Sequence, residues 1–193
     1  MMINYIKFVR RRMIPVRRVL QAAFNYWSAL HVRSACERVG HELEVLGSVK
    51  IYGDGQFLLG NKVCLRSRSH NTIEMFSGVN ARLIIGDQVF VNQGTRIICT
   101  KHIAIGNNCL IGDECLLIDN DYHTISTRPV RQEPIILEDN VWLASRVIIL
   151  RGVTIGRGSV IGAGAVVTRS IPQYSFAVGA PAKVFKTIPE TSR

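Results

Sequence analysis

One spacing constrains the fold of this 193-residue chain more than any other feature: aliphatic residues recur at every sixth position. A period of six fits neither the 3.6-residue turn of an α-helix nor the two-residue alternation of a long strand. It suits a short strand and a turn repeated on each face of a prism, with one aliphatic side chain per face pointing inward. The uninterrupted register is Leu137, Leu143, Ile149, Ile155, Ile161 and Val167.

The same register predicts which residues stack. Three hexads would complete one coil, so residues three hexads apart should lie above one another. The expected pairs are Leu137 with Ile155, Leu143 with Ile161, and Ile149 with Val167. An earlier block repeats the pattern around Ile85, Ile105 and Ile111, each followed by Gly and then by Asp or Asn. Such residues tolerate the backbone angles of tight corners, so we expect a column of aliphatic side chains enclosed by polar turns.

The N-terminal part is different in kind. We divide the chain into a basic helical segment (1–44), a β-helix (45–188) and a short tail (189–193). From Val16 the apolar residues follow the spacing of one helical face, and Pro15 suits the first turn. That face comprises Val19, Leu20, Ala23, Phe24, Trp27 and Leu30. Every residue before Glu37 is neutral or basic, so much of the formal net charge of +10 lies in this segment.

This basic amphipathic helix has two interpretations, which are compatible. It packs against its own domain or a partner subunit, or it lies on anionic lipid as a peripheral membrane anchor. The cluster lacks a recognisable nucleic-acid-binding module, so no nucleic-acid partner is expected. Polar residues at Gln21, Asn25 and Ser28 interrupt the stretch, so no window has the roughly 18 apolar residues of a membrane span.

The cysteines indicate a reducing compartment. The chain has five, without a CxxC pair, and Cys109 and Cys115 occupy a position of the repeat that otherwise carries small residues. They are therefore interpreted as reduced packing residues. No clean cleavage site follows the N-terminal apolar stretch, so a secretory signal is not expected. We expect a cytoplasmic protein, either free or at the inner face of the membrane.

The segment ILEDNVWLASRVIILRGVTIGRGSVIGAGAVVTRSIP, followed by VGAPAKV, resembles the hexapeptide-repeat acyltransferases. This resemblance covers about residues 45–188. It implies a left-handed parallel β-helix and a homotrimer with active sites between neighbouring subunits. The subgroup that the chain most resembles comprises galactoside and maltose O-acetyltransferases and relatives that acetylate surface polysaccharides. It implies acetyl-coenzyme A (acetyl-CoA) as donor, a saccharide hydroxyl as acceptor, and no metal.

The resemblance assigns the catalytic base to His123. The segment Asp119-Asn120-Asp121-Tyr122-His123 interrupts the repeat where the family carries its catalytic histidine. An imidazole titrates near neutral pH, so it can take a proton from a hydroxyl that attacks the thioester and pass it to the departing thiolate. Asp119 or Asp121 could orient the other ring nitrogen, or both could be solvated turn residues. His70 and His102 are interpreted as structural.

The remaining site residues also follow from the resemblance. It places Asn92, Asp121 and Trp142 at the acceptor, but Thr100 stands where the family has an acidic residue, so the acceptor is not identified. Arg128 and Arg131 either favour an anionic glycan or are solvated loop charges. The coenzyme contacts implied are Ser145, Ala163, Thr168, Arg169, Lys183 and Lys186. Small residues would admit the narrow pantetheine arm, and cations would meet the phosphates.

The sequence therefore predicts an acetyl-CoA-dependent saccharide O-acetyltransferase of lipopolysaccharide, capsule or exopolysaccharide synthesis. One alternative is an acetyltransferase for an antibiotic or an amino sugar. A second is a non-catalytic β-helix that serves as an assembly partner. A third is a γ-type carbonic anhydrase, which holds zinc with three histidines, but the histidines here lack the paired spacing. Serine acetylation is disfavoured because the long helical domain of that group would not fit before the repeats.

Overall fold

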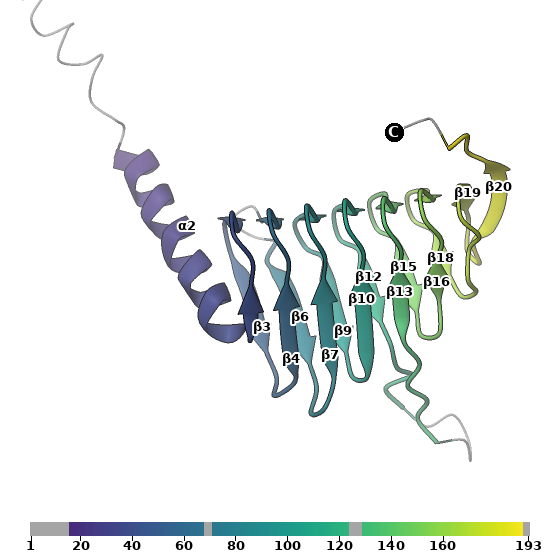
Figure 1. The fold of residues 1–193 in the computed structure, drawn as a ribbon, viewed down its shortest axis with the longest axis horizontal. Helices are drawn as coiled ribbons and strands as arrows, with labels where there is room; N and C mark the ends of the chain where they lie inside the picture. Colours follow the sequence, from purple (N-terminus) through teal and green to yellow (C-terminus); the bar gives the residue numbers. More distant parts are fainter. Residues whose placement is uncertain (1–15, 68–70, 124–128, 191–193) are drawn as a thin grey trace, which may run out of the picture.

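The computed structural model describes residues 16–67, 71–123 and 129–190. In these residues the chain winds into a prism whose three faces are sheets of six, eight and six strands, named A, B and C here. The first eighteen strands enter the three sheets in rotation, and each coil stacks on the one before it (Figure 1). The helix α2 (Val16–Ala35) precedes the first coil.

The strands are short, as the six-residue period requires. Sheet A contains β1 (Arg38–Val39), β4 (Gln56–Leu59), β7 (Arg82–Ile85), β10 (His102–Ile105), β13 (Ile135–Leu137) and β16 (Thr154–Ile155). Sheet B contains β2 (Glu44–Leu46), β5 (Cys64–Arg66), β8 (Phe90–Val91), β11 (Leu110–Ile111), β14 (Trp142–Leu143), β17 (Val160–Ile161), β19 (Ser175–Val178) and β20 (Lys183–Thr187). Sheet C contains β3 (Val49–Tyr52), β6 (Ile73–Ser77), β9 (Arg96–Cys99), β12 (Leu116–Ile118), β15 (Ile148–Leu150) and β18 (Val166–Val167).

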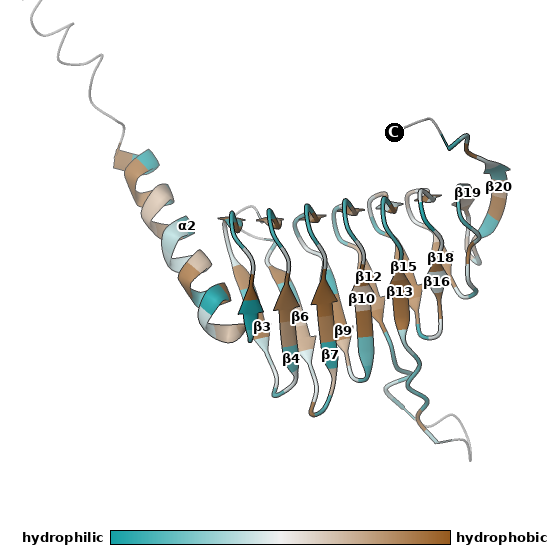
Figure 2. Cartoon of the chain, in the orientation of Figure 1, coloured by the Kyte–Doolittle hydropathy of each residue, from teal (hydrophilic) through white to brown (hydrophobic). Residues whose placement is uncertain are grey.

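The predicted stacking is confirmed pair by pair. Leu137 lies opposite Ile155 in sheet A, Leu143 opposite Ile161 in sheet B, and Ile149 opposite Val167 in sheet C, each in parallel register. All members of the six-residue register are at most 1% exposed. The strands carry the hydrophobic residues, whereas the turns between them are more hydrophilic (Figure 2). The core is therefore a column of aliphatic side chains, closed on three sides by hydrogen-bonded backbone.

The corner between sheets A and B (the A–B corner) is regular. The backbone N–H and the side-chain amide of Asn61 both donate to the Asp87 carboxylate. The Asp87 N–H donates to Asn107 Oδ1 at 2.8 Å, and the Asn107 N–H donates to Asp139 Oδ1 at 2.8 Å. Each turn thus receives its hydrogen-bond acceptor from the next coil, which satisfies backbone groups that the strands leave unpaired.

The corner between sheets C and A (the C–A corner) is interrupted after β12 by a longer loop, which extends away from the prism (Figure 1). Its two ends pair as a short antiparallel hairpin, with Asn120 opposite Gln132. The Asp121 N–H donates to the carbonyl of Arg131 at 3.2 Å, and the Glu133 N–H donates to that of Asp119 at 3.0 Å. These backbone hydrogen bonds join the two ends of the loop to each other at its base.

The expected N-terminal helix is present from Val16, but its predicted apolar face does not cover the domain. That face is exposed, from 38% at Leu30 to 69% at Trp27. Contact with the first coil comes from another side near the helix end, where Val32 is buried and Ala29 is partly buried. Asn25 Oδ1 also accepts a hydrogen bond from the Gly47 N–H at 3.0 Å. The helix projects from the prism, so only its last turns reach the coil (Figure 1).

The two ends of the prism are built differently from its middle. At the first coil, β1 pairs with β4, so the coils begin at Arg38 and not near residue 45. At the last coil, β20 turns back and pairs antiparallel with β19, whereas the pairs within the prism are parallel. Its side chains are exposed throughout.

Candidate active site

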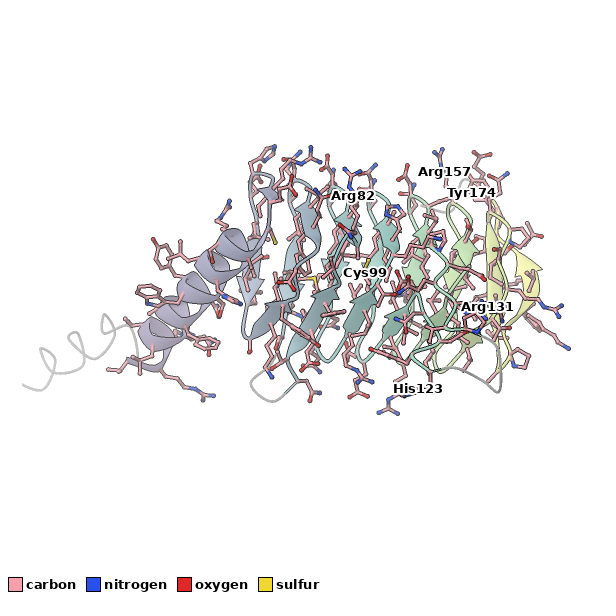
Figure 3. All side chains as sticks on the ribbon, turned by 90° about the horizontal axis from the view of Figure 1, so that it is seen from below. Arg82, Cys99, His123, Arg131, Arg157 and Tyr174 are labelled. Carbon is pink, nitrogen blue, oxygen red and sulfur yellow. The ribbon has the colours of Figure 1, made fainter. Side chains whose placement is uncertain are left out.

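His123 is exposed on the loop at the C–A corner, at the edge of the prism opposite Arg157 and Tyr174 (Figure 3). The Tyr122 N–H donates to Asn120 Oδ1 at 2.7 Å, and the His123 N–H donates to the Asp121 carbonyl at 2.6 Å. Tyr122 has a left-handed backbone conformation, with φ at 58°, which is unusual for a bulky side chain. These local bonds turn the chain outward and present the imidazole to solvent.

Asp119 does not orient the His123 ring, although the sequence left that role open. It is fully buried, and its carboxylate accepts hydrogen bonds from an earlier turn of the same corner. Oδ1 accepts from the backbone N–H and the hydroxyl of Thr100, and Oδ2 accepts from the N–H groups of Lys101 and His102. Thr100 therefore shares the C–A corner with the loop, and its hydroxyl already has a partner.

Arg151, on the next coil, holds both ends of the loop. Its Nε donates to Asp121 Oδ1, and its Nη1 lies 3.0 Å from Glu133 Oε1. Arg131 Nε lies 3.7 Å from the other oxygen of Asp121. The hydrogen bond from Arg151, together with the charges of Arg151 and Arg131, lowers the pKa of the Asp121 carboxyl. Asp121 is therefore paired with Arg151 and Arg131. Within the described residues its carboxylate makes no hydrogen bond to the His123 ring.

A second group of predicted residues meets at the corner between sheets B and C (the B–C corner). Asn92, Trp142 and Ser145 line one open pocket of about 430 Å³, together with Asp113 and the outward side chains of sheet B. The Asn92 amide donates to Asp113, while Asn92 Oδ1 accepts from the Gln93 N–H at 3.0 Å. Asn92 lies two coils before Trp142 and Ser145, and the coil between them contributes Asp113 to the same cavity.

The predicted coenzyme residues fall into three places. Ser145 and Ala163 are exposed at the B–C corner of successive coils. The turn at Ala163 is open, because a side chain added at Gly164 would meet nothing within 4 Å. Lys183 and Lys186 lie exposed on β20, at the end of sheet B. Thr168 and Arg169 are exposed at the C–A corner instead. A narrow chain could follow the small residues of the B–C corner toward Lys183.

One chain does not bring His123 to the pocket. The loop lies at the C–A corner and Asn92 at the B–C corner, with sheet C between them. The strand β9 alone has four residues, which span about 13 Å at the usual rise per residue. A reacting hydroxyl could not touch both side chains of the same chain.

The sequence missed Asp113 and Arg151. Asp113 sits in an ordinary turn position of the repeat, so nothing distinguished it from the structural acids of the other turns. Arg151 had a weak signal, because it directly follows the strand that stacks on β12, where the loop leaves the repeat. Its contacts lie 30 and 18 positions earlier in the chain, and no spacing rule predicts them.

Arg128 and His70 lie outside the described residues. In the part that is described, no cluster of three or more His, Cys, Asp or Glu side chains could hold a metal ion. That part also contains no helix with the length and apolar character needed to cross a bilayer. All five cysteines carry free thiols, and burial raises the pKa of Cys109 and of Cys115 to about 11.

Comparison with known proteins supports the repeat assignment. The bacterial transferase hexapeptide family (six repeats) matches residues 134–169. A probable acetyltransferase of Mycobacterium tuberculosis, Rv3034c, is 39% identical over 60% of this chain and 40% of its own length. The polysialic acid O-acetyltransferase of Escherichia coli O1:K1 is 38% identical over 55% of this chain and 36% of its own. The galactoside O-acetyltransferase of Escherichia coli K12 is 32% identical over 60% and 66%.

The chain spans between 36% and 52% of the length of the first three curated relatives. Among solved structures, the hexapeptide-repeat acetyltransferase VCA0836 of Vibrio cholerae, complexed with acetyl coenzyme A, superposes with a TM-score of 0.56. It is 23% identical, and the match covers 82% of this chain and 74% of that one. The expected left-handed winding is thereby confirmed. The chain is therefore a hexapeptide-repeat protein with the left-handed β-helix fold of the acyltransferases that its sequence resembles.

Proposed function

We propose that this protein is an acetyl-CoA-dependent O-acetyltransferase that acts on a saccharide hydroxyl, with His123 as the base. The pocket at the B–C corner carries this proposal, because it unites Asn92, Trp142 and Ser145, which were expected at the acceptor and the coenzyme. The names of the relatives agree, since two are O-acetyltransferases of a polysaccharide or a galactoside. Surface-polysaccharide synthesis is the biological setting that we favour.

In the proposed reaction the His123 imidazole accepts the proton of the acceptor hydroxyl. The hydroxyl oxygen attacks the acetyl carbonyl carbon, the carbon–sulfur bond breaks, and the thiolate of coenzyme A takes the proton from the imidazolium. The protein's own contribution is to hold the base and both substrates in line. Arg151 fixes the loop that carries His123, and the small residues at Ala163 and Gly164 leave room for the pantetheine arm.

The proposed site needs more than one copy of the chain. His123 and the pocket lie at different corners, so the C–A corner of one subunit would face the B–C corner of its neighbour. A closed ring of three subunits repeats this contact at every interface and leaves neither of these two corners unpaired. The trimer is therefore part of the proposal, and each active site belongs to two subunits.

We also propose that α2 attaches the protein to the inner face of the cytoplasmic membrane. Its exposed apolar side chains include Leu20, Phe24 and Trp27, and Arg17 and Arg18 flank them. Apolar and aromatic side chains beside cations suit the interface of an anionic bilayer. Trp27→Glu should weaken binding to vesicles that contain anionic lipid, whereas Phe185→Glu, at an equally exposed aromatic on β20, should not. Equal binding by wild type and Trp27→Glu would contradict the proposed attachment of α2 to the membrane.

The central test is acetyl transfer by His123→Ala. Purified wild-type protein should release coenzyme A thiol from acetyl-CoA when a suitable saccharide is present, and the variant should be slower by about 100-fold or more. His41→Ala is the matched control, because His41 is an exposed histidine at the A–B corner. Undiminished turnover by His123→Ala would overturn the assignment. Mass spectrometry of surface glycans with and without the protein would identify the acceptor by the missing acetyl group.

A further inference from the structure

The Asn92 side chain is held by three partners at the B–C corner. Its Nδ2 donates to the Asp113 carboxylate of the next coil. Its Oδ1 accepts from the Gln93 N–H at 3.0 Å and from Arg66 Nε, one coil earlier, at 3.4 Å. The backbone is fixed as well, because the Asn92 N–H donates to the Ile111 carbonyl at 3.0 Å. Both the backbone and the side chain of Asn92 are therefore tied to neighbouring coils.

These three partners permit only one orientation of the Asn92 amide. The Asp113 carboxylate can only accept a hydrogen bond, so it requires the Nδ2 end. The Gln93 N–H and the Arg66 guanidinium can only donate, so they require Oδ1. A flipped amide would set its oxygen against the carboxylate and its N–H groups against two donors. The chemistry of the three partners therefore fixes which end of the amide meets which coil.

Arg66 is itself held beside the pocket, although its side chain is exposed. Its guanidinium carbon lies 5.0 Å from the centroid of the Phe90 ring. Phe90 lines the same pocket as Asn92 and Asp113. A guanidinium over an aromatic face is attracted to that ring and loses part of its conformational freedom. The Phe90 ring therefore helps to place the guanidinium that reaches Asn92.

One hydrogen-bonding group of the Asn92 side chain is left for a ligand. The amide has two N–H groups, and the described residues use one of them, whereas they use both lone pairs of Oδ1. Asn92 is half-buried and lines the pocket, so the second N–H is available to a ligand there. With this orientation Asn92 can donate to a ligand but cannot accept from it.

We propose that Asp113 and Arg66 are positioning residues that make Asn92 a donor to the acceptor hydroxyl. This inference rests on the proposed function and specifies how that site orients its acceptor. A hydroxyl can both donate and accept. When its oxygen accepts the Asn92 N–H, its own hydrogen stays free for the His123 imidazole. An Asn92 side chain that accepted would instead engage the proton that the base must remove.

Steady-state kinetics of the full-length protein, with acetyl-CoA and methyl galactoside as the acceptor probe, test the effect on the reaction. Asp113→Ala should lower kcat by about tenfold, because the amide is free to rotate, and should leave the KM for acetyl-CoA unchanged. Asp113→Asn should recover most of this loss, since its Oδ1 can accept from Asn92. Glu114→Gln is the matched control, because it removes a charge from the same turn that is paired with Arg146.

Nuclear magnetic resonance tests the orientation of the amide without acetyl transfer. The two Nδ2 protons of Asn92 are assigned by the loss of their signals in Asn92→Asp. In wild type their signals should be widely separated, because one proton faces a carboxylate and hydrogen bonds to ionised groups are strong. Asp113→Ala should bring the two signals closer together, whereas Glu114→Gln should leave them as in wild type.

The two measurements separate failure of the positioning role from failure of the proposed function. Amide signals that do not respond to Asp113→Ala would overturn the positioning role, and so would equal losses of kcat in Asp113→Ala and Asp113→Asn. Responsive signals in a wild-type protein that transfers no acetyl group to any saccharide would overturn the proposed function, and with it the donation to a hydroxyl. Thermal denaturation of each variant shows whether it is folded.

Discussion

The A–B and C–A corners belong to the same coils, yet they use their polar residues in opposite ways. At the A–B corner, Asn and Asp alternate along the prism, and each accepts a hydrogen bond from the turn of the coil before it. At the C–A corner the repeat is broken by the loop of His123, and Asp119 and Arg151 tie that loop to neighbouring coils. At the A–B corner the polar side chains bond to one another along the prism, whereas the C–A corner presents the His123 side chain to solvent.

This difference indicates where a repeat protein can place chemistry. A corner whose side chains satisfy each other has none left for a ligand, and extending it adds stability without adding a site. A corner that leaves the repeat must satisfy its buried groups by bonds specific to that place. The substitutions below remove or alter these interactions, first at the C–A corner and then at the A–B corner.

The largest effect is expected from Asp119→Asn. The substitution keeps the shape but replaces an accepting oxygen with an NH₂ group that faces backbone N–H donors. It should lower the free energy of unfolding by about 3–5 kcal/mol, since hydrogen bonds to a buried carboxylate are lost and donors are left unpaired. Urea denaturation measures the change. Asp54→Asn, at an exposed acid in the C–A turn of the first coil, should leave stability nearly unchanged. Similar small changes in both would mean that Asp119 is not the support of this corner.

Arg151→Ala should affect activity more than folding. Without the clamp on Asp121 and Glu133, the loop would hold His123 less well, and kcat should fall by about 30-fold. The KM for acetyl-CoA should change little, because Arg151 is engaged with Asp121 and Glu133 of the loop and is not among the predicted coenzyme contacts. Arg157→Ala, which removes an exposed arginine paired with Asp139 at the A–B corner, is the control. Steady-state kinetics of both variants would distinguish a loop effect from a general loss of charge.

The ion pair between Asp121 and Arg151 also predicts how the free energy of unfolding depends on pH. The pKa of Asp121 is lower in the folded protein than its ordinary value of 3.8, so its ion pair with Arg151 stabilises the folded state above that value. The stabilisation is lost as the pH falls through the folded-state pKa. The difference in unfolding free energy between wild type and Arg151→Ala should therefore be constant near neutral pH and shrink in strong acid. A difference that grew in acid would contradict this linkage.

A smaller effect is expected from Asn107→Asp at the A–B corner. The hydrogen bond from the Asn61 N–H holds the pKa of Asp87 low, so the ladder is anionic at neutral pH. A third carboxylate between Asp87 and Asp139 would add repulsion and remove the amide donor. We expect a loss of about 1–2 kcal/mol in unfolding free energy, partly restored by salt. Asn108→Asp, one position outside the ladder, should cost less. Equal losses of unfolding free energy in Asn107→Asp and Asn108→Asp would show that the alternation of Asn and Asp along the A–B corner does not determine its stability.

The smallest effect concerns backbone strain at the regular corner. Gln88 and Asn108 have positive φ values of 57° in equivalent turns. Gln88→Gly should raise the unfolding free energy by about 0.5 kcal/mol, because the relief of strain exceeds the added entropy of the unfolded chain. Asn108→Gly should gain less, since Asn tolerates this conformation. The two midpoints of urea denaturation give the comparison, and a greater gain at Asn108 would contradict it.

The sequence predicted the regular parts of the molecule because their rule is local. Each inward position repeats every six residues, so the spacing alone was enough to pair Leu143 with Ile161. Asn92, Trp142 and Ser145 were found through the family resemblance, and the repeat then explains why they meet. The role of His123 stays a prediction, because the fold shows its place and exposure but not its chemistry.

The irregular parts could not be predicted in the same way. Asp119 binds a turn that lies 17 to 19 positions earlier, across a slip in the register. The helix α2 was predicted from its apolar face, but an amphipathic pattern does not say what covers that face. In this chain the side near Ala29 and Val32 makes the contact, since the helix leaves the first coil at its end.

The antiparallel turn of β20 also limits how the protein can assemble. A stack of parallel strands ends in an open row of N–H and C=O groups, which could template another copy end to end. Here the last strand of sheet B folds back, so a further parallel coil would meet a reversed strand with lysines on it. At the other end the last turns of α2 contact β2 and β3 of the first coil. The reversed strand β20 at one end of the prism and helix α2 at the other thus oppose end-to-end growth into a filament.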